Sequence, residues 1–534
     1  MENLGIIILL LFLIAFLALL SKRYNFSFPV VLLIVGITVS LVPGLPLIVL
    51  EPEIIFLLFL PALLYSAAWF TSWHEFKANL RPISLAAFGL VFFTTGVIGV
   101  VAHYIIPGFS WAHSFLLGAI ISPPDAVAAT TITRNLGLHP RIVTILEGES
   151  LINDASGLIA YKYALGAILS GAFAFWEAGL QFFIVVIGGV LVGLVIGFVL
   201  YIIHKKWVND PTVEVTLTLL TPLTSYLLAE NFHVSGVLAV VTTGLYLSFR
   251  SNYIFTTQSR IRAYAVWEVV TFILNGLIFI LLGLQLRYVM SEIRGYSVFE
   301  LFYYGLVICL VAFLVRFLWT IPAALLPRVL SKRIRETETF DRRNILVFTW
   351  AGIRGVVSMA AALAIPLLLP DGTAFPHRSL IIFLTFCFIV FTAVGQGLTL
   401  PWLIRKLKLP RYSILAEEYE VRMQILSRAI SYIEENLSLI DQDMLARLKS
   451  KYELRFNRLQ KTDLPANYFG TEKPKTPEQI FNEYIRLQIE LIRIEREMLS
   501  QLHESGKAKL EVIRKIEREL DLEEERLSME LFES

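Results

Sequence analysis

The chain has 534 residues, of which 56% are hydrophobic, and its net charge at pH 7 is +2. Soluble globular domains are about 45–50% apolar, so this composition excludes an ordinary soluble protein. The two cysteines form no disulfide framework and the eight histidines follow no zinc-binding pattern. We therefore expect no cofactor and no nucleic-acid partner.

Apolar stretches recur through the first 410 residues, and each is long enough to cross a bilayer. They predict an all-α polytopic membrane protein with about thirteen transmembrane helices. The first stretch has no basic residues before it and no small-residue cleavage site after it, so we expect a retained helix and not a signal peptide. The predicted helices cover residues 4–20, 28–50, 54–70, 83–106, 114–133, 148–170, 180–203, 213–230, 234–249, 266–286, 298–326, 345–369 and 379–404.

The loops between the predicted helices alternate in charge. Lysine and arginine gather in every second loop, as at Lys205 and Lys206, and the intervening loops hold few of them. Short cytoplasmic loops carry such a basic excess. We therefore expect a multi-pass protein of the inner (plasma) membrane with its N-terminus outside and its C-terminus in the cytoplasm.

Thirteen helices allow two six-helix repeats of opposite orientation, helices 1–6 and 8–13, on either side of helix 7. Helix 5 then corresponds to helix 12, and both contain helix-breaking residues. Helix 5 holds Pro123 and Pro124 in "ISPPDAVAATT", and helix 12 holds Gly352 and Gly355 in "TWAGIRGVVS". Broken helices at corresponding positions of two repeats indicate a transporter binding site.

The composition changes after Pro410. Residues 412–460 and 477–534 are rich in charged residues with apolar residues at helical spacing, and a linker with several prolines joins them. We expect a transmembrane domain at residues 1–410 and a helical cytoplasmic tail at residues 411–534. A regulatory role for the tail is a hypothesis, and the sequence indicates no ligand for it.

Ionisable residues inside membrane helices are costly and indicate function. Those of the predicted helices include Asp125, Glu149, Asp154, Lys162, Arg316 and Arg354. Asp125 and Glu149 need permanent cationic partners, for which the two arginines are available. Each of these residues, taken alone, is also consistent with a structural contact between helices, and for Lys162 we favour that interpretation.

Asp154 differs because a buried carboxylate without a fixed cation favours its neutral form. It is then able to bind either a proton or a monovalent cation. Hard cations prefer oxygen ligands, and the candidates beside Asp154 are Asn153, Ser150, Thr130 and Thr131. We place Na⁺ at Asp154 and expect no catalytic residues.

Five segments together resemble the monovalent cation/proton antiporter family, which includes the NhaP-type bacterial antiporters and the animal sodium/proton exchangers. They are "GESLINDASGLIAY", "SPPDAVAAT", "FLPALLYSAAW", "WAGIRGVVSMAAALAIP" and "VGQGLTLPWLIRKL". The resemblance covers roughly residues 1–410. It implies a NhaA/NapA-like fold, in which a core domain moves against a dimerisation domain, and a homodimer.

The resemblance also implies roles for single residues. Glu149 matches a glutamate that forms a salt bridge with an arginine of helix 11, here Arg316. Asp125 matches the aspartate of the broken helix 5, and its implied partner is Arg354 in the broken helix 12. Both pairs are implied to be structural contacts of the core, with Asp125 also near the cation.

Asp154 matches the aspartate that carries the ion and the proton, and Asn153 matches the asparagine that precedes it in electroneutral members. Two departures leave the preference between Na⁺ and K⁺ open. Pro124 stands where many relatives have threonine, and Ser66 stands where many have an acidic residue.

The predicted function is electroneutral exchange of a monovalent cation, Na⁺ with Li⁺ or K⁺ as alternatives, for H⁺ in pH and Na⁺ homeostasis. Four other functions are weighed against it: a K⁺/H⁺ antiporter, a cation channel, a sensor that signals through the tail, and a proton-coupled carrier of an organic ion. An enzyme is not expected, because the sequence holds no nucleophile–base motif. The expected partners are the transported ions, membrane lipid, a second copy of the chain and an unidentified regulator of the tail.

Overall fold

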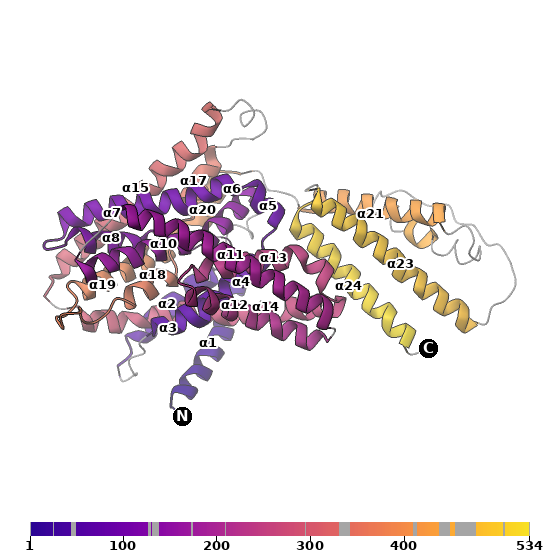
Figure 1. Ribbon diagram of the computed structural model, residues 1–534, viewed down its shortest axis with the longest axis horizontal. Helices are drawn as coiled ribbons and strands as arrows, with labels where there is room; N and C mark the ends of the chain where they lie inside the picture. The colour runs from indigo at the N-terminus through magenta and orange to yellow at the C-terminus, as the bar shows by residue number, and fades with distance from the viewer. Residues whose placement is uncertain are drawn as a thin grey trace. The chain divides into compact units, whose positions relative to one another are not determined.

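The structure is a computed structural model of the chain (Figure 1). It describes residues 2–24, 26–43, 50–125, 130, 138–171, 175–208, 210–293, 295–330, 342–409, 414–436, 449–453, 456, 477–505 and 508–532. The chain divides into two compact units. Unit 1 comprises Met1–Val208, Val213–Ile254 and Ala265–Arg411, and unit 2 comprises Asn209–Thr212, Phe255–Tyr264 and Tyr412–Ser534.

The membrane part is built from helices. They are α1 (Glu2–Tyr24), α2 (Phe28–Ser40), α3 (Pro52–Ile54), α4 (Leu60–Phe70), α5 (Trp73–Ala78), α6 (Leu80–Ser84), α7 (Val91–Ile105), α8 (Trp111–Ile121), α10 (Pro140–Ser170), α11 (Phe175–Trp207), α12 (Pro211–Asn231), α13 (Gly236–Ile254), α14 (Thr257–Glu292), α15 (Val298–Leu330), α17 (Arg342–Trp350), α18 (Val356–Leu363), α19 (Arg378–Val390) and α20 (Gly397–Lys406). Three π-helical segments join neighbouring helices: η1 (Ile55–Phe59), η2 (Leu85–Leu90) and η3 (Phe391–Gln396).

Within the described residues, seven helical segments are long and apolar enough to cross a membrane. They are Pro52–Phe70, Leu80–Ile105, Gly179–Trp207, Pro211–Asn231, Thr257–Glu292, Val298–Leu325 and Arg378–Lys406. The apolar helices α2 and α8 are shorter. The prediction of an all-α polytopic membrane protein is therefore confirmed, and each of the thirteen expected segments contains helix in its described part.

Both helices that were expected to be broken are interrupted. α8 ends at Ile121 and non-helical backbone continues to Asp125, while α17 ends at Trp350 and α18 begins only at Val356. Pro123 and Pro124 explain the first interruption, since neither can donate a helical hydrogen bond. We call residues 122–125 and 351–355 the first and second break.

The π-helical segment η2 lies against α10, the helix that carries Asp154. Two of its carbonyl oxygens accept hydrogen bonds from other helices. The Ser156 hydroxyl donates to the Ala87 oxygen over 2.5 Å, and the Trp319 indole donates to the Leu85 oxygen over 3.2 Å. Because Ser156 follows Asp154 by two residues, its bond to η2 helps to fix the rotation of α10.

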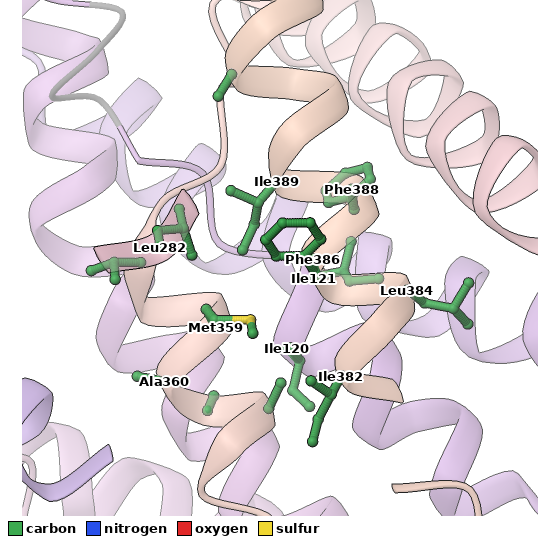
Figure 2. Packing of buried hydrophobic residues seen from close by; sticks show 14 of the residues in the cluster. Ile120, Ile121, Leu282, Met359, Ala360, Ile382, Leu384, Phe386, Phe388 and Ile389 are labelled. Carbon is green, nitrogen blue, oxygen red and sulfur yellow. The ribbon is translucent and has the colours of Figure 1, made fainter. Parts of the chain in front are cut away.

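Apolar packing holds the two short helices beside the breaks. Figure 2 shows Ile120 and Ile121 of α8 and Met359 of α18 packed with side chains of α19, among them Phe388 and Ile389. All belong to one cluster of buried hydrophobic residues. The ends of α8 and α18 therefore have positions fixed by burial.

α7 and α8 approach each other closely at Gly118. A Cβ atom there would lie 3.1 Å from both the Cα and the carbonyl carbon of Thr95, which is nearer than ordinary contact. The neighbour is backbone of a packed helix and cannot rotate away as a side chain does. Gly118 is therefore required by this crossing.

Gly118→Ala is expected to lower the free energy of unfolding by about 1–3 kcal/mol, the usual cost of overpacking. Thermal unfolding of the detergent-solubilised protein measures the loss. Gly96→Ala on α7 is the control, because nothing lies within 4 Å of a Cβ added there. Equal losses in the two variants would contradict the crossing as the cause.

Unit 2 contains α21 (Ile414–Asn436), α23 (Pro477–Glu504) and α24 (Leu510–Phe532). Their apolar faces meet in a common cluster that includes Val421, Ile425, Ile492, Leu499, Val512 and Ile516. The helical tail expected from the sequence is thus a packed group of helices with its own hydrophobic core.

Unit 2 also includes Phe255–Tyr264, and so it holds the first residues of α14. Arg260 of this segment is buried and donates to both carboxylate oxygens of Asp521 on α24, at 2.5 and 3.2 Å. Arg496 of α23 lies 2.6 Å from the same carboxylate and 2.6 Å from Glu524. The beginning of α14 is therefore part of the charged core of the tail.

Asp521→Ala is expected to destabilise unit 2 by about 3–5 kcal/mol, because it leaves the buried Arg260 guanidinium without its carboxylate. Limited proteolysis of the full-length protein should then cut the tail faster. Glu497→Ala is the control, since the ion pair of Glu497 with Arg493 is exposed, with 61% and 75% of the two side chains accessible. Cleavage at the same rate in both variants would contradict the prediction.

Candidate functional site

Asn153 and Asp154 lie side by side in the middle of α10, and both are buried. The Asn153 Nδ2 donates to the Pro124 carbonyl oxygen over 2.7 Å. Its Oδ1 is buried, and no described residue forms a hydrogen bond with it. The amide is therefore held by the first break and presents an unused acceptor.

Asp154 as a whole residue is 8% exposed. Within the part of the chain that the structure describes, no hydrogen bond or ion pair of this carboxylate is found. The negative charge of Asp125 lies near enough to repel it. Burial of such a carboxylate in its charged form is costly unless a positive ligand compensates its charge.

Glu149, on the same helix, has a fixed cation. Both Arg316 terminal nitrogens donate to its two oxygens, at 2.7 and 2.9 Å, in a bidentate pair. Both side chains are buried, and Arg316 also lies 4.9 Å over the Phe348 ring. The charges of Glu149 and Arg316 cancel within the helix packing, so this carboxylate is not available to a mobile ion.

The two breaks are bonded to each other. The Asp125 amide donates to the Ile353 carbonyl oxygen over 2.8 Å, and the Arg354 guanidinium donates to the Ser122 carbonyl oxygen. The Arg354 amide donates to the Thr392 hydroxyl over 3.1 Å. Backbone groups that the broken helices cannot satisfy are thus satisfied across the site, as the membrane interior requires.

The glycines of the second break permit this close approach. A Cβ at Gly352 would lie 2.7 Å from the Arg316 side chain, and a Cβ at Gly355 would collide with the Asp125 carboxylate. The Gly-x-Arg-Gly spacing therefore lets one ionisable side chain rest on each side of Arg354.

The charges at the breaks also match the ends of the helices. Arg354 donates to Ser122 directly after the C-terminus of α8, where the helix dipole is negative. Asp125 packs against Gly355, which precedes the positive N-terminus of α18. Helix ends and side chains therefore share in stabilising both charges.

The structure describes some of the other residues predicted for the site but not all of them. Ser150 lies one turn before Asp154 on α10 and Thr130 is buried, while Thr131 lies outside the described residues. The pairing of Asp125 with Arg354 stays a prediction. Lys162 pairs with Glu230 of α12 over 3.1 Å, which agrees with a structural contact for this lysine.

The sequence did not indicate Thr392 or Ser156. Both hydroxyls are buried: Thr392 accepts a bond from the second break, and Ser156, on the helix of Asp154, donates to η2. A threonine or serine in an apolar helix commonly bonds to its own helix backbone, so neither residue gives a local signal of a longer-range role.

Comparison with known proteins identifies the family. The sequence model of the family described as "Sodium/hydrogen exchanger, transmembrane" matches residues 8–406, which include every residue of the site. The chain belongs to this family. Members are membrane transporters that exchange cations for protons, and this protein is accordingly a transporter and not an enzyme.

Two curated relatives illustrate the similarity. The chain is 31% identical over 494 residues to the "Sodium, potassium, lithium and rubidium/H(+) antiporter" of Bacillus pumilus, covering 89% of this chain and 73% of the relative. It is 33% identical over 385 residues to the "Na(+)/H(+) antiporter ApNhaP" of Aphanothece halophytica, covering 72% of this chain and 70% of the relative.

A solved structure shows the same fold. The sodium proton antiporter MjNhaP1 from Methanocaldococcus jannaschii at pH 8 superposes with a TM-score of 0.60 at 20% identity. The match covers 76% of this chain and 99% of MjNhaP1. The expectation of an antiporter fold is therefore confirmed.

Glu149→Gln is expected to lower the free energy of unfolding by about 3–5 kcal/mol, because it leaves the buried Arg316 uncompensated. Thermal unfolding in detergent measures the loss. The double variant Glu149→Gln, Arg316→Met removes both charges and should regain part of the stability. Strictly additive losses would show that the two residues do not act as a pair.

Proposed function

We propose that the protein is an electroneutral antiporter in which one carboxylate, Asp154, binds either a monovalent cation or a proton. The observation that carries this proposal is the contrast between two buried acids on α10. Glu149 has a permanent bidentate arginine, whereas no partner of the Asp154 carboxylate is found among the described residues. Only the second acid is available for exchange.

Coupling follows from the cost of a bare charge. An uncompensated carboxylate at the membrane centre costs at least about 2.5–3.5 kcal/mol, so the core crosses readily only when Asp154 carries a cation or a proton. The Glu149–Arg316 pair travels as a neutral unit. One cation then moves against one proton, which gives electroneutral exchange.

Na⁺ is a hard cation that needs oxygen ligands in addition to the Asp154 carboxylate. The proposed ligands are the Asn153 Oδ1, which accepts no bond from the described residues, the hydroxyls of Ser150, Thr130 and Thr131, and the carboxylate of Asp125. Li⁺ and K⁺ are further candidates, since the Bacillus pumilus relative is named for sodium, potassium, lithium and rubidium. A K⁺/H⁺ antiporter is therefore the second candidate function.

We further propose the cellular setting expected from the sequence. The protein works as a homodimer in the plasma membrane, with its N-terminus outside and its C-terminus in the cytoplasm, and supports pH and Na⁺ homeostasis. The basic residues of alternate loops support the orientation. Residues 411–534 serve as a regulatory tail.

The test is cation-driven proton movement in proteoliposomes. Asp154→Asn should reduce the flux to the level of empty vesicles, because the amide carries no exchangeable charge. Glu230→Gln is the matched control, since it removes another membrane-helix acid whose pair with Lys162 is partly exposed. Sodium-driven proton flux retained in Asp154→Asn would refute the assignment.

A panel of Na⁺, Li⁺, K⁺ and Rb⁺ with and without a clamped membrane potential settles the remaining alternatives. Exchange that is independent of the potential supports electroneutrality. Uncoupled conductance would favour a channel, and a response to K⁺ alone would favour the second candidate.

A further inference from the structure

We propose that Thr392 is a positioning residue for the cation site: its hydroxyl fixes the peptide group between Ile353 and Arg354 and thereby the backbone of Asp125. The proposal rests on the proposed exchange at Asp154. It assigns a role in ion binding to a residue that faces the site from outside the two breaks.

A single peptide group is held from both sides. The peptide that joins Ile353 and Arg354 contributes the Ile353 carbonyl and the Arg354 N–H, which point in opposite directions in a trans peptide. The Asp125 amide donates to the carbonyl over 2.8 Å, and the N–H donates to the Thr392 hydroxyl over 3.1 Å. Rotation of this peptide would break both bonds together.

Thr392 is suited to be a fixed acceptor. It is 3% exposed in the π-helical segment η3, and its hydroxyl proton is directed to the carbonyl oxygens of Phe388 and Ile389, at 3.0 and 3.1 Å. With its proton used in this way, the oxygen presents a lone pair to the Arg354 amide. Thr392 is thus bonded both to its own continuous helix and to the second break, so it holds the break in a fixed position relative to that helix.

The consequence for the ion site follows from the next contacts. Arg354 donates from its side chain to the Ser122 carbonyl, and Asp125 packs on Gly355. If the peptide before Arg354 turns, the first break loses the Ile353 acceptor and the backbone of Asp125 loses one of its restraints. Asp125 is a proposed cation ligand, so the cation affinity should fall.

Thr385 offers a matched comparison. It lies two turns earlier on α19, it is fully buried, and its hydroxyl donates to the Ile381 carbonyl over 2.8 Å, as threonines in helices do. In the described structure it accepts no bond from a break. Thr385→Val and Thr392→Val therefore each remove one threonine hydroxyl, from α19 and from the adjoining η3, and only Thr392→Val removes an acceptor from the site.

The experiment measures sodium-driven proton flux in proteoliposomes as a function of Na⁺ concentration, at several pH values, together with thermal unfolding. Thr392→Val should raise the half-saturating Na⁺ concentration about tenfold, as expected when a buried donor loses its acceptor. Thr392→Ser keeps the hydroxyl and should stay close to the unaltered protein. Thr385→Val should leave the half-saturating Na⁺ concentration unchanged, because the hydroxyl of Thr385 accepts no bond from either break in the described structure.

An unchanged half-saturating concentration in Thr392→Val, or an equal rise in Thr385→Val, would overturn the proposal while leaving exchange at Asp154 intact. Absence of exchange in the unaltered protein would instead contradict the proposed function. If Thr392→Val does not fold, the proposal is tested by measuring amide hydrogen exchange in the unaltered protein. The Arg354 amide should exchange as slowly as the helical amides of α18, and exchange at the rate of an exposed amide would overturn the proposal.

Discussion

The membrane interior leaves no backbone polar group without a partner, since each unsatisfied group costs several kcal/mol. The two breaks expose such groups, and they satisfy one another. The Ser122 carbonyl accepts a hydrogen bond from the Arg354 side chain, and the Ile353 carbonyl accepts one from the Asp125 amide. The Pro124 carbonyl accepts one from the Asn153 side chain. Neither helix can be broken in this way without the other.

This mutual satisfaction determines which groups remain for an ion. The Asn153 side-chain nitrogen donates to the first break, and its oxygen accepts no bond from the described residues. Glu149 is neutralised by Arg316. Asp154 is the second buried acid of this helix, and the described contacts provide no cation for it. Under the proposed function, the permanently paired acid and the exchanging acid therefore lie on one helix, five residues apart.

The membrane helices and both breaks were predictable from the sequence, because hydrophobic runs, prolines and glycines are local signals. It also singled out Glu149 and Arg316, since buried charges in apolar helices are rare. Thr392 was not foreseen, because its bond to Arg354 crosses 38 residues and its alternative, a bond to its own helix, looks the same in sequence. The bond between Arg260 and Asp521 spans 261 residues and gave no signal either.

The position of Arg260 changes what can be learned by truncating the chain. Removing everything after residue 411 would also deprive the buried Arg260 of its carboxylate partner Asp521. A shortened protein would carry a cation without its carboxylate in the first turns of α14, so altered transport would not report on the tail alone. Exchanging the charges of Arg260 and Asp521 perturbs the same junction while keeping the chain whole.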